Sequence, residues 1–100
     1  MKGNFKEIIK SDVPVIVDWY AEWCGPCKAM GPILEQLKAE LGDSVKIIKV
    51  DTDDNPELAI EYQIRSIPTI MIFKNGENLY RESGIKTKEA LISLVQKHSN

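Results

Sequence analysis

Two cysteines, Cys24 and Cys27, are separated in this chain only by a glycine and a proline. If Pro26 occupies the first turn of a helix, Cys24 lies at the helix N-terminus, where unpaired N–H groups and the helix dipole favour a thiolate over a thiol. Cys27 follows one turn later, with its Cα about 5 Å away, within disulfide range. The spacing therefore predicts a redox dithiol in which Cys24 attacks a substrate disulfide and Cys27 resolves the mixed disulfide.

Two other uses of such a pair have weaker support. A structural disulfide between these positions would close a very short loop and contribute only about 2 kcal/mol in the chain-entropy model. A zinc ion or a bridged iron–sulfur cluster needs a second pair of ligands. The chain has no further cysteine, and its single histidine, His98, lies near the C-terminus. A closed metal site would therefore need two chains.

Composition narrows the partners and the compartment. The chain has 100 residues, 43% of them hydrophobic, which is a common size for one domain, and we expect residues 1–100 to form it. Thirteen basic and fifteen acidic residues are interspersed, without the basic stripe that nucleic acid requires. The sequence shows no export signal and no apolar run that would span a membrane. Two closely spaced cysteines are typical of a working dithiol in a reducing compartment, so we expect a cytoplasmic protein.

Hydrophobic periodicity alternates between helix and strand along the whole chain and predicts an α/β fold. The dithiol would follow the C-terminal end of the first strand, the edge where sites occur in open α/β sheets. The expected strands are 15–20, 45–51, 69–73 and 78–82, with a hairpin turn at Asn75-Gly76. The expected helices are one presenting Phe5, Ile8 and Ile9, one from the dithiol to Gly42, one after an N-cap at Asn55 and one after an N-cap at Thr87.

The segment Trp23-Cys24-Gly25-Pro26-Cys27-Lys28 resembles the active-site signature of the thioredoxin family. The resemblance implies the thioredoxin fold, a central mixed sheet flanked by four helices. Relatives usually begin with an extra strand beside the strand 45–51, whereas only Met1 to Asn4 precede the first helix expected here. We therefore expect that strand to be absent or vestigial, which leaves four strands and an open edge. Further matches run along the chain at Val17-Asp18, Pro32-Ile33-Leu34, 51–56, Ile64-Arg65, Ile67-Pro68-Thr69, 73–77 and Gly84.

The resemblance also implies roles for two charged residues near the dithiol. Asp18 matches the family's buried aspartate, which takes the proton of Cys27 through water, and burial would raise the pKa of this carboxyl. Lys49 matches a lysine that stabilises the charged form of that aspartate. Without the resemblance, Asp18 would be an aspartate in an ordinary salt bridge and Lys49 a lysine on a solvated strand face.

A surface for client proteins is implied as well. Pro68 matches the family's cis-proline, whose loop faces the dithiol and lets the backbone of Ile67 pair with an extended client segment. An apolar surface around an exposed Cys24 sulfur would consist of Trp23, Gly25, Pro26, Ile67, Gly84 and Ile85. Many relatives have tryptophan where this chain has Tyr20 and glycine where it has Ser66. For Trp19 and Tyr20, which lie within a strand, we expect packing in the core.

Together these features predict a protein-disulfide reductase, a thiol–disulfide oxidoreductase cycling between the dithiol and the disulfide Cys24–Cys27. The resemblance implies no further cofactor and a place in electron transport and cell redox homeostasis. It implies a flavin-dependent, NADPH-using thioredoxin reductase as electron donor, disulfide-containing clients, and no nucleic acid or membrane partner. We expect a monomer. A disulfide isomerase and a non-catalytic thioredoxin-like binding module are the alternatives.

Overall fold

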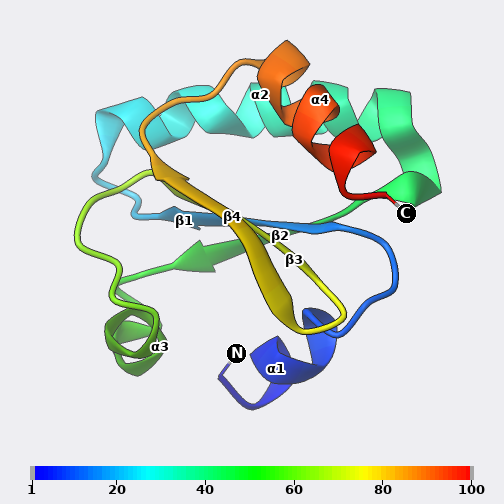
Figure 1. Ribbon diagram of the computed structural model, residues 1–100. Coiled ribbons are helices and arrows are strands. Elements are labelled where there is room, and N and C mark those ends of the chain that lie inside the picture. Colours follow the sequence, from blue (N-terminus) through cyan, green and yellow to red (C-terminus); the bar gives the residue numbers. More distant parts are fainter. Residues whose placement is uncertain (1, 100) are drawn as a thin grey trace.

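A four-stranded mixed sheet lies between two layers of helices in the computed structural model, which describes residues 2–99 and the side chains of residues 4–99 (Figure 1). The strand order is β2-β1-β3-β4, with β1 parallel to β2 and antiparallel to β3, and β3 antiparallel to β4. β1 is therefore a central strand, while β2 and β4 are the edges. The strands are β1 (Val15–Tyr20), β2 (Lys46–Asp51), β3 (Thr69–Lys74) and β4 (Glu77–Ser83).

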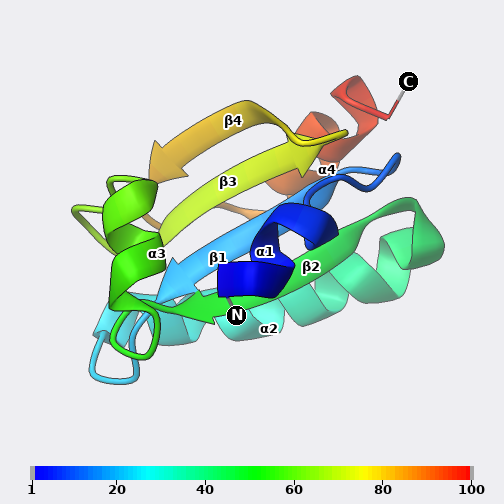
Figure 2. The same cartoon turned by 90° about the horizontal axis from the view of Figure 1, so that it is seen from below.

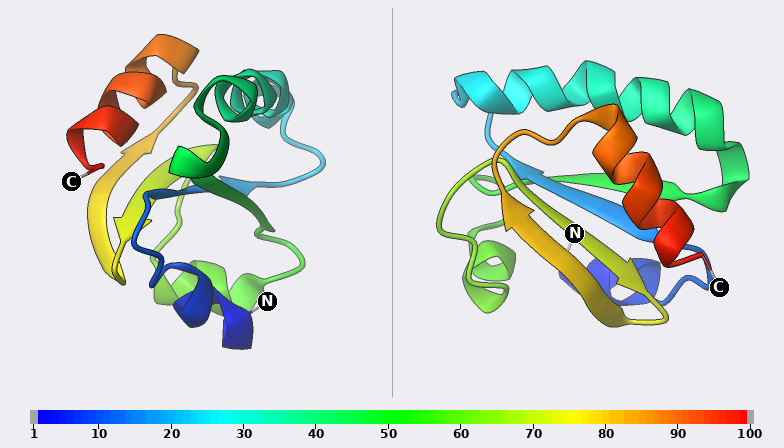
Figure 3. Two further views of the ribbon diagram at one scale, coloured as in Figure 1. Left: turned by 90° about the vertical axis from the view of Figure 1, so that its right-hand side faces the viewer. Right: turned by 45° about the horizontal axis from the view of Figure 1, so that its top comes forward.

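The helices divide between the two faces of the sheet. Figure 1 shows α2 and α4 on one face, and the view from below in Figure 2 shows α1 and α3 on the other. The two views in Figure 3 show the long α2 lying over the sheet beside α4. The sequence prediction of a four-stranded α/β fold with four helices is confirmed. The helices are α1 (Lys2–Ile8), α2 (Gly25–Leu41), α3 (Pro56–Glu61) and α4 (Lys88–Lys97), with a short 3-10 helix at Gly42–Ser44.

β1 has apolar side chains on both faces because it is covered on both sides. Val15, Val17 and Trp19 belong to the apolar cluster beneath α1 and α3, whereas Ile16 belongs to the cluster beneath α2 and α4. Successive side chains of a strand point to opposite faces. Asp18 therefore lies on the α2 face, the face of the helix that begins with the dithiol.

Phe5 holds the short helix α1 against the sheet. Its ring is fully buried, and its centroid lies 5.0 Å from that of Tyr62, 5.7 Å from that of Trp19 and 5.9 Å from that of Phe73. Tilted and edge-to-face ring pairs at such separations stabilise a core beyond the area that they bury. A helix of seven residues is marginal alone, so these contacts account for α1.

Local signals placed most of the element boundaries. Asn75 and Gly76 both have positive φ, at 54° and 81°, as the predicted tight hairpin requires. The Thr87 hydroxyl accepts a hydrogen bond from the Ala90 N–H at 3.1 Å, which confirms that N-cap. The side chain of Asn55 makes no capping bond and instead donates its amide to the Asp51 carbonyl at 3.0 Å. Asn55 is therefore the N-cap residue of α3, as predicted, but its side chain makes no capping hydrogen bond because the amide ties α3 back to β2.

The N-terminal prediction needs one correction. The first helix begins at Lys2, not after Asn4, so residues 2–4 are helical. Met1 lies outside the described residues. Within residues 2–99 the sheet has no fifth strand, as predicted, and its β2 edge is open. No helix in this part of the chain combines the length and the apolar character needed to cross a membrane.

Replacing Phe5 with alanine tests the aromatic anchor. Phe5→Ala should lower the free energy of unfolding by about 3 to 5 kcal/mol, because it removes a buried ring and leaves a cavity that three other rings line. Guanidinium titration of the oxidised protein, followed by circular dichroism, measures the change. Ile60→Ala is the control, since Ile60 is 75% exposed and should change stability by less than about 0.5 kcal/mol. Equal effects of the two substitutions would contradict the anchoring role.

Candidate functional site

The two cysteines form a disulfide at the N-terminus of α2, with their Cα atoms 5.3 Å apart. Cys24 is the N-cap residue, and Pro26 lies in the first turn, where a missing N–H costs nothing. The Cys27 N–H donates to the Cys24 sulfur at 3.2 Å. A backbone donor and a helix N-terminus both stabilise negative charge on that sulfur once the disulfide is reduced. This geometry agrees with the predicted dithiol.

The dithiol is less exposed than expected. Cys24 and Cys27 are each 4% exposed. The prediction that Cys24 is exposed therefore needs correction, because neighbouring residues bury it in the disulfide state. The Cys24 sulfur lies 3.8 Å from the Ile67 carbonyl oxygen, and Ile67 packs against the cysteines. A disulfide sulfur has no proton, so this is a packing contact in the oxidised state. A client disulfide must therefore reach a sulfur that neighbouring residues largely cover.

Asp18 is fully buried, and neither of its carboxylate oxygens has a hydrogen-bond partner within the described part of the chain. Within the described residues, Asp18 therefore does not form the ordinary salt bridge that was the alternative. Burial raises the pKa of Asp18 from 3.8 to about 6, and the nearby charge of Lys49 offsets part of that increase. A carboxyl with such a pKa can both accept and release a proton close to neutral pH.

Lys49 lies next to Asp18 across the parallel pair β1 and β2, in register with it. Its ammonium lies 4.7 Å from the centre of the Tyr20 ring, a cation–π distance. Tyr20 is half-buried and covers this cation, so the expectation that it packs in the core holds for Trp19 but not for Tyr20. The difference arises because Tyr20 ends β1 at the rim of the sheet.

A small hollow lies between Lys49 and Cys27. It has a volume of about 120 Å³ and is lined by Cys27 and Lys28 of α2, by Lys49 of β2, and by residues 20–22 at the end of β1. A water molecule occupies about 30 Å³ of liquid volume, so the hollow has room for a few. Polar and ionic groups in its wall would hold such waters between Cys27 and the surface.

The loop opposite the dithiol is fixed to β4. The Ile67–Pro68 bond is cis, as predicted. The Gly84 N–H donates to the Pro68 carbonyl at 2.8 Å, and the Ser66 hydroxyl donates to the Ser83 hydroxyl at 2.9 Å. Ser66, which the sequence marked only as a departure from relatives, is therefore a brace between this loop and β4. These bonds hold Gly84 and Ser83 against the segment from Ser66 to Pro68, which includes Ile67.

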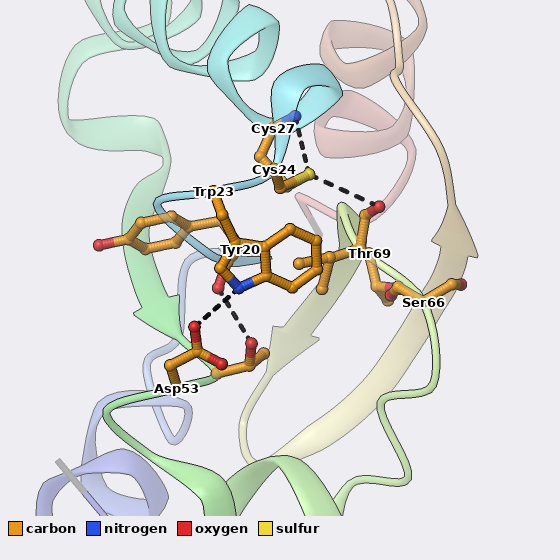
Figure 4. Close-up of a disulfide and its surroundings, with 9 residues drawn as sticks. Tyr20, Trp23, Cys24, Cys27, Asp53, Ser66 and Thr69 are labelled. Atoms are coloured by element: carbon orange, nitrogen blue, oxygen red, sulfur yellow. Dashed lines mark hydrogen bonds between the residues drawn. A yellow bond between two sulfur atoms is a disulfide. The ribbon is translucent and has the colours of Figure 1, made fainter.

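Trp23 is 71% exposed, as predicted for a docking residue. Its indole N–H donates to the Asp53 carboxylate at 2.8 Å, which Figure 4 shows beside the disulfide. The Asp53 N–H in turn donates to the carboxylate of Asp51 at 2.8 Å. Sequence reasoning missed Asp53, because it lies 30 residues from Trp23 and nothing in its local sequence sets it apart from the adjacent aspartates.

The remaining predicted site residues surround the disulfide. Gly25 and Pro26 are exposed at the start of α2, and Ile85 is 49% exposed. The structure thus places Ile67 against the two cysteines and Lys49 in the wall of the hollow beside Cys27, with Asp18 buried next to Lys49. Within residues 2–99, no three or more histidine, cysteine, aspartate or glutamate side chains gather as metal ligands would.

Comparison with known proteins gives a consistent result. The sequence model of the family Thioredoxin matches residues 1–97. The thioredoxin of Rickettsia typhi is 50% identical over 95 residues, covering 94% of this chain and 90% of its own length. Thioredoxin 1 of Synechococcus elongatus is 43% identical over 97 residues, covering 96% and 91%.

Solved structures agree with the sequences. The crystal structure of oxidised mitochondrial thioredoxin 3 from Saccharomyces cerevisiae has a TM-score of 0.85 and 31% identity, covering 96% of this chain and 89% of that one. A mutant thioredoxin from Halobacterium salinarum has a TM-score of 0.87 and 32% identity, covering 98% and 85%. The likeness extends over nearly the whole length of each chain.

Burial of Asp18 predicts a pH-dependent stability. The folded protein retains this proton up to about pH 6, whereas the unfolded chain releases it near 3.8, so stability is lost as the pH rises through this window. The loss is on the order of 3 kcal/mol above it. Asp18→Asn should therefore raise the free energy of unfolding by about that amount near pH 8 and change it little near pH 3.

Denaturant titrations of the oxidised wild type and variant at the two pH values measure this difference. The exposed Asp12 provides the control, because Asp12→Asn should leave the stability difference between the two pH values unchanged. An Asp18→Asn variant no more stable than the wild type near pH 8 would contradict the raised pKa.

Proposed function

We propose which step of disulfide reduction each site residue carries out, starting from the family of the chain. The chain belongs to the thioredoxin family and, like its members, is a thiol–disulfide oxidoreductase that reduces the disulfides of proteins. The observation that carries the proposal is the disulfide at the start of α2, with a backbone N–H directed at the Cys24 sulfur, while the buried carboxyl of Asp18 lies on the α2 face of β1. The chain acts as a single domain over residues 1–100, which is supported by a family model that matches residues 1–97.

Cys24 carries out the first half of the reaction. Its thiolate attacks one sulfur of a client disulfide, the client S–S bond breaks, and the second client sulfur leaves as a thiolate. The leaving thiolate takes a proton, and Cys24 remains joined to the client as a mixed disulfide. The helix N-terminus and the Cys27 N–H support this role, since both favour the thiolate form of Cys24.

Cys27 carries out the second half. Its thiol loses a proton, the resulting thiolate attacks the Cys24 sulfur, and the mixed disulfide breaks. The client leaves with both of its sulfurs reduced, and the two electrons have come from the Cys24–Cys27 pair, which is now a disulfide. Asp18 accepts the Cys27 proton through water in the adjoining hollow, and Lys49 stabilises the carboxylate that Asp18 becomes again when it passes this proton to solvent.

Clients dock on the apolar surface around the disulfide. Trp23 and Ile85 both expose large apolar areas, and the small exposed residues Gly25 and Pro26 place little bulk next to Cys24. The Ile67 backbone, 3.8 Å from the Cys24 sulfur, supplies hydrogen-bonding groups to an extended client segment. The hydrogen bond from the Trp23 indole to Asp53 fixes the position of the indole, so the Trp23 side chain loses less conformational freedom when a client binds.

The family implies two kinds of partner, disulfide-containing clients and a thioredoxin reductase. We propose that the reductase is the flavin-dependent type that uses NADPH, and that the protein works as a cytoplasmic monomer in electron transport and cell redox homeostasis. No cofactor beyond the redox disulfide enters this scheme. The comparisons favour a reductase over the two alternatives, an isomerase and a non-catalytic binding module, because the relatives are named thioredoxins.

Cysteine substitutions test the division between attack and resolution. Cys24→Ser should leave insulin reduction by dithiothreitol no faster than without protein, because the attacking thiolate is gone. Cys27→Ser should accumulate a covalent complex with insulin chains, detected by mass spectrometry without reductant, since attack proceeds and resolution does not. Covalent trapping by the Cys24→Ser variant instead would reverse the assigned roles.

The proton acceptor is tested with Ellman's reagent, whose coloured thiolate is released once when Cys24 attacks and again when Cys27 resolves. Asp18→Asn should slow the second release by about a hundredfold near pH 7 and leave the first unchanged. In the wild type, the rate of the second release should rise with pH through about 6, the pKa of Asp18. Asp12→Asn is the matched control, and equal slowing of both releases by Asp18→Asn would contradict the role.

A further inference from the structure

The β2 edge of the sheet carries unpaired backbone groups. β2 pairs only with β1, and the Lys46 N–H donates to the Pro14 carbonyl at 2.9 Å, so Lys46 directs its backbone toward β1. In a parallel pair, each residue directs its N–H and its C=O to the same side of the strand, and successive residues direct them to opposite sides. Ile47 and Lys49 therefore direct theirs away from the sheet. A row of such groups is a template for another strand.

A groove runs along this edge. Its volume is about 660 Å³, and it is lined by Gly31 and Leu34 of α2, Ile8 of α1, and Ile47 and Ile48 of β2. The groove therefore has one helix on each side and the open strand edge as its floor. It differs in place from the surface around the disulfide, although Lys49 lines both this groove and the small hollow beside Cys27.

The groove walls determine which side chains fit. A strand laid along β2 would direct alternate side chains toward α2 and toward α1, because strand side chains alternate between faces. Both walls offer apolar atoms, from Leu34 on one side and Ile8 on the other. An occupant must therefore be apolar at consecutive positions, like a strand that is covered on both faces.

Charges at the groove favour an acidic occupant. Three lysines line it, Lys38, Lys46 and Lys49, against a single glutamate, Glu35. Carboxylates at the ends of an apolar segment would meet these cations, while basic residues would be repelled. A second copy of this chain fits poorly, because it would bring the same cations and a β2 edge that is itself set between its own helices.

We propose that this groove binds an extended segment of another protein, apolar at its centre and acidic at its ends, which adds a fifth strand to the sheet at β2. Backbone hydrogen bonds to Ile47 and Lys49 give the binding its affinity, and the two apolar walls with the lysines select the sequence. The binding is separate from disulfide reduction and needs no cysteine in the partner.

Gly31→Leu is the variant that fills the groove. A Cβ at Gly31 would lie 4.0 Å from its nearest neighbour, the Lys49 ammonium, which is ordinary contact, and leucine favours a helix more than glycine does. The fold is therefore expected to survive, and thermal unfolding checks it. Lys46→Glu, at an exposed residue, is a second variant that reverses one groove charge, and Lys97→Glu on α4 is its matched control.

The probe is a fluorescein-labelled peptide without cysteine, Glu-Glu-Val-Thr-Val-Ile-Val-Glu-Glu, titrated with oxidised protein and followed by anisotropy. Gly31→Leu should weaken its binding at least tenfold and Lys46→Glu about threefold to tenfold, while Lys97→Glu should change it less than twofold. The same peptide with lysines in place of its glutamates should bind at least tenfold more weakly. Hydrogen exchange should slow at the Ile47 and Lys49 amides and not along β4.

Equal binding to the wild type and the Gly31→Leu variant, or unchanged exchange at the Ile47 and Lys49 amides, would overturn the proposal. Sedimentation gives a further outcome: a dimer that Gly31→Leu dissociates would identify a second copy as the occupant and would also overturn it. Since the probe has no sulfur, these results stand apart from the insulin assay, and either proposal can fail while the other holds.

Discussion

A carboxyl group without a hydrogen-bond partner in the described structure is buried in the central strand of this protein, and the site depends on that costly placement. Asp18 stays in place because β1 is paired on both sides and covered by helices on both faces. Val15, Val17 and Trp19 of the same strand belong to one apolar core, and Ile16 belongs to the other. The scaffold therefore holds the carboxyl in an environment that raises its pKa toward neutrality, where proton transfer is most useful.

Burial also links stability to function. An ionised carboxylate with little compensation destabilises the folded state, and the same lack of compensation makes it a base suited to a thiol. Lys49 moderates this conflict, because its charge acts on Asp18 while its ammonium stays exposed over the ring of Tyr20. Three elements therefore contribute to the proposed proton-transfer site, since β1 buries the carboxyl, β2 supplies the cation, and α2 carries the sulfurs on the same face of the sheet.

The two faces of the sheet serve different purposes. On one face, the aromatic cluster around Phe5 anchors short helices, and Ile67 packs both against the core that contains Phe5 and against the two cysteines. On the other face, α2 begins at the cysteines and continues along the β2 edge, where it becomes a wall of the open groove. One helix therefore takes part in two surfaces, the apolar front around the disulfide and the groove along the edge.

The sequence by itself determined the features that depend on near neighbours along the chain. Spacing placed Cys24 and Cys27 one helical turn apart, Asn75-Gly76 specified a hairpin, and periodicity identified each strand and helix to within a few residues. Resemblance to a family added the cis bond at Pro68. Only the tertiary structure decided which distant groups meet, such as Trp23 with Asp53 and Ser66 with Ser83. Such contacts depend on how the elements pack, and local propensity carries no information about the partner across the fold.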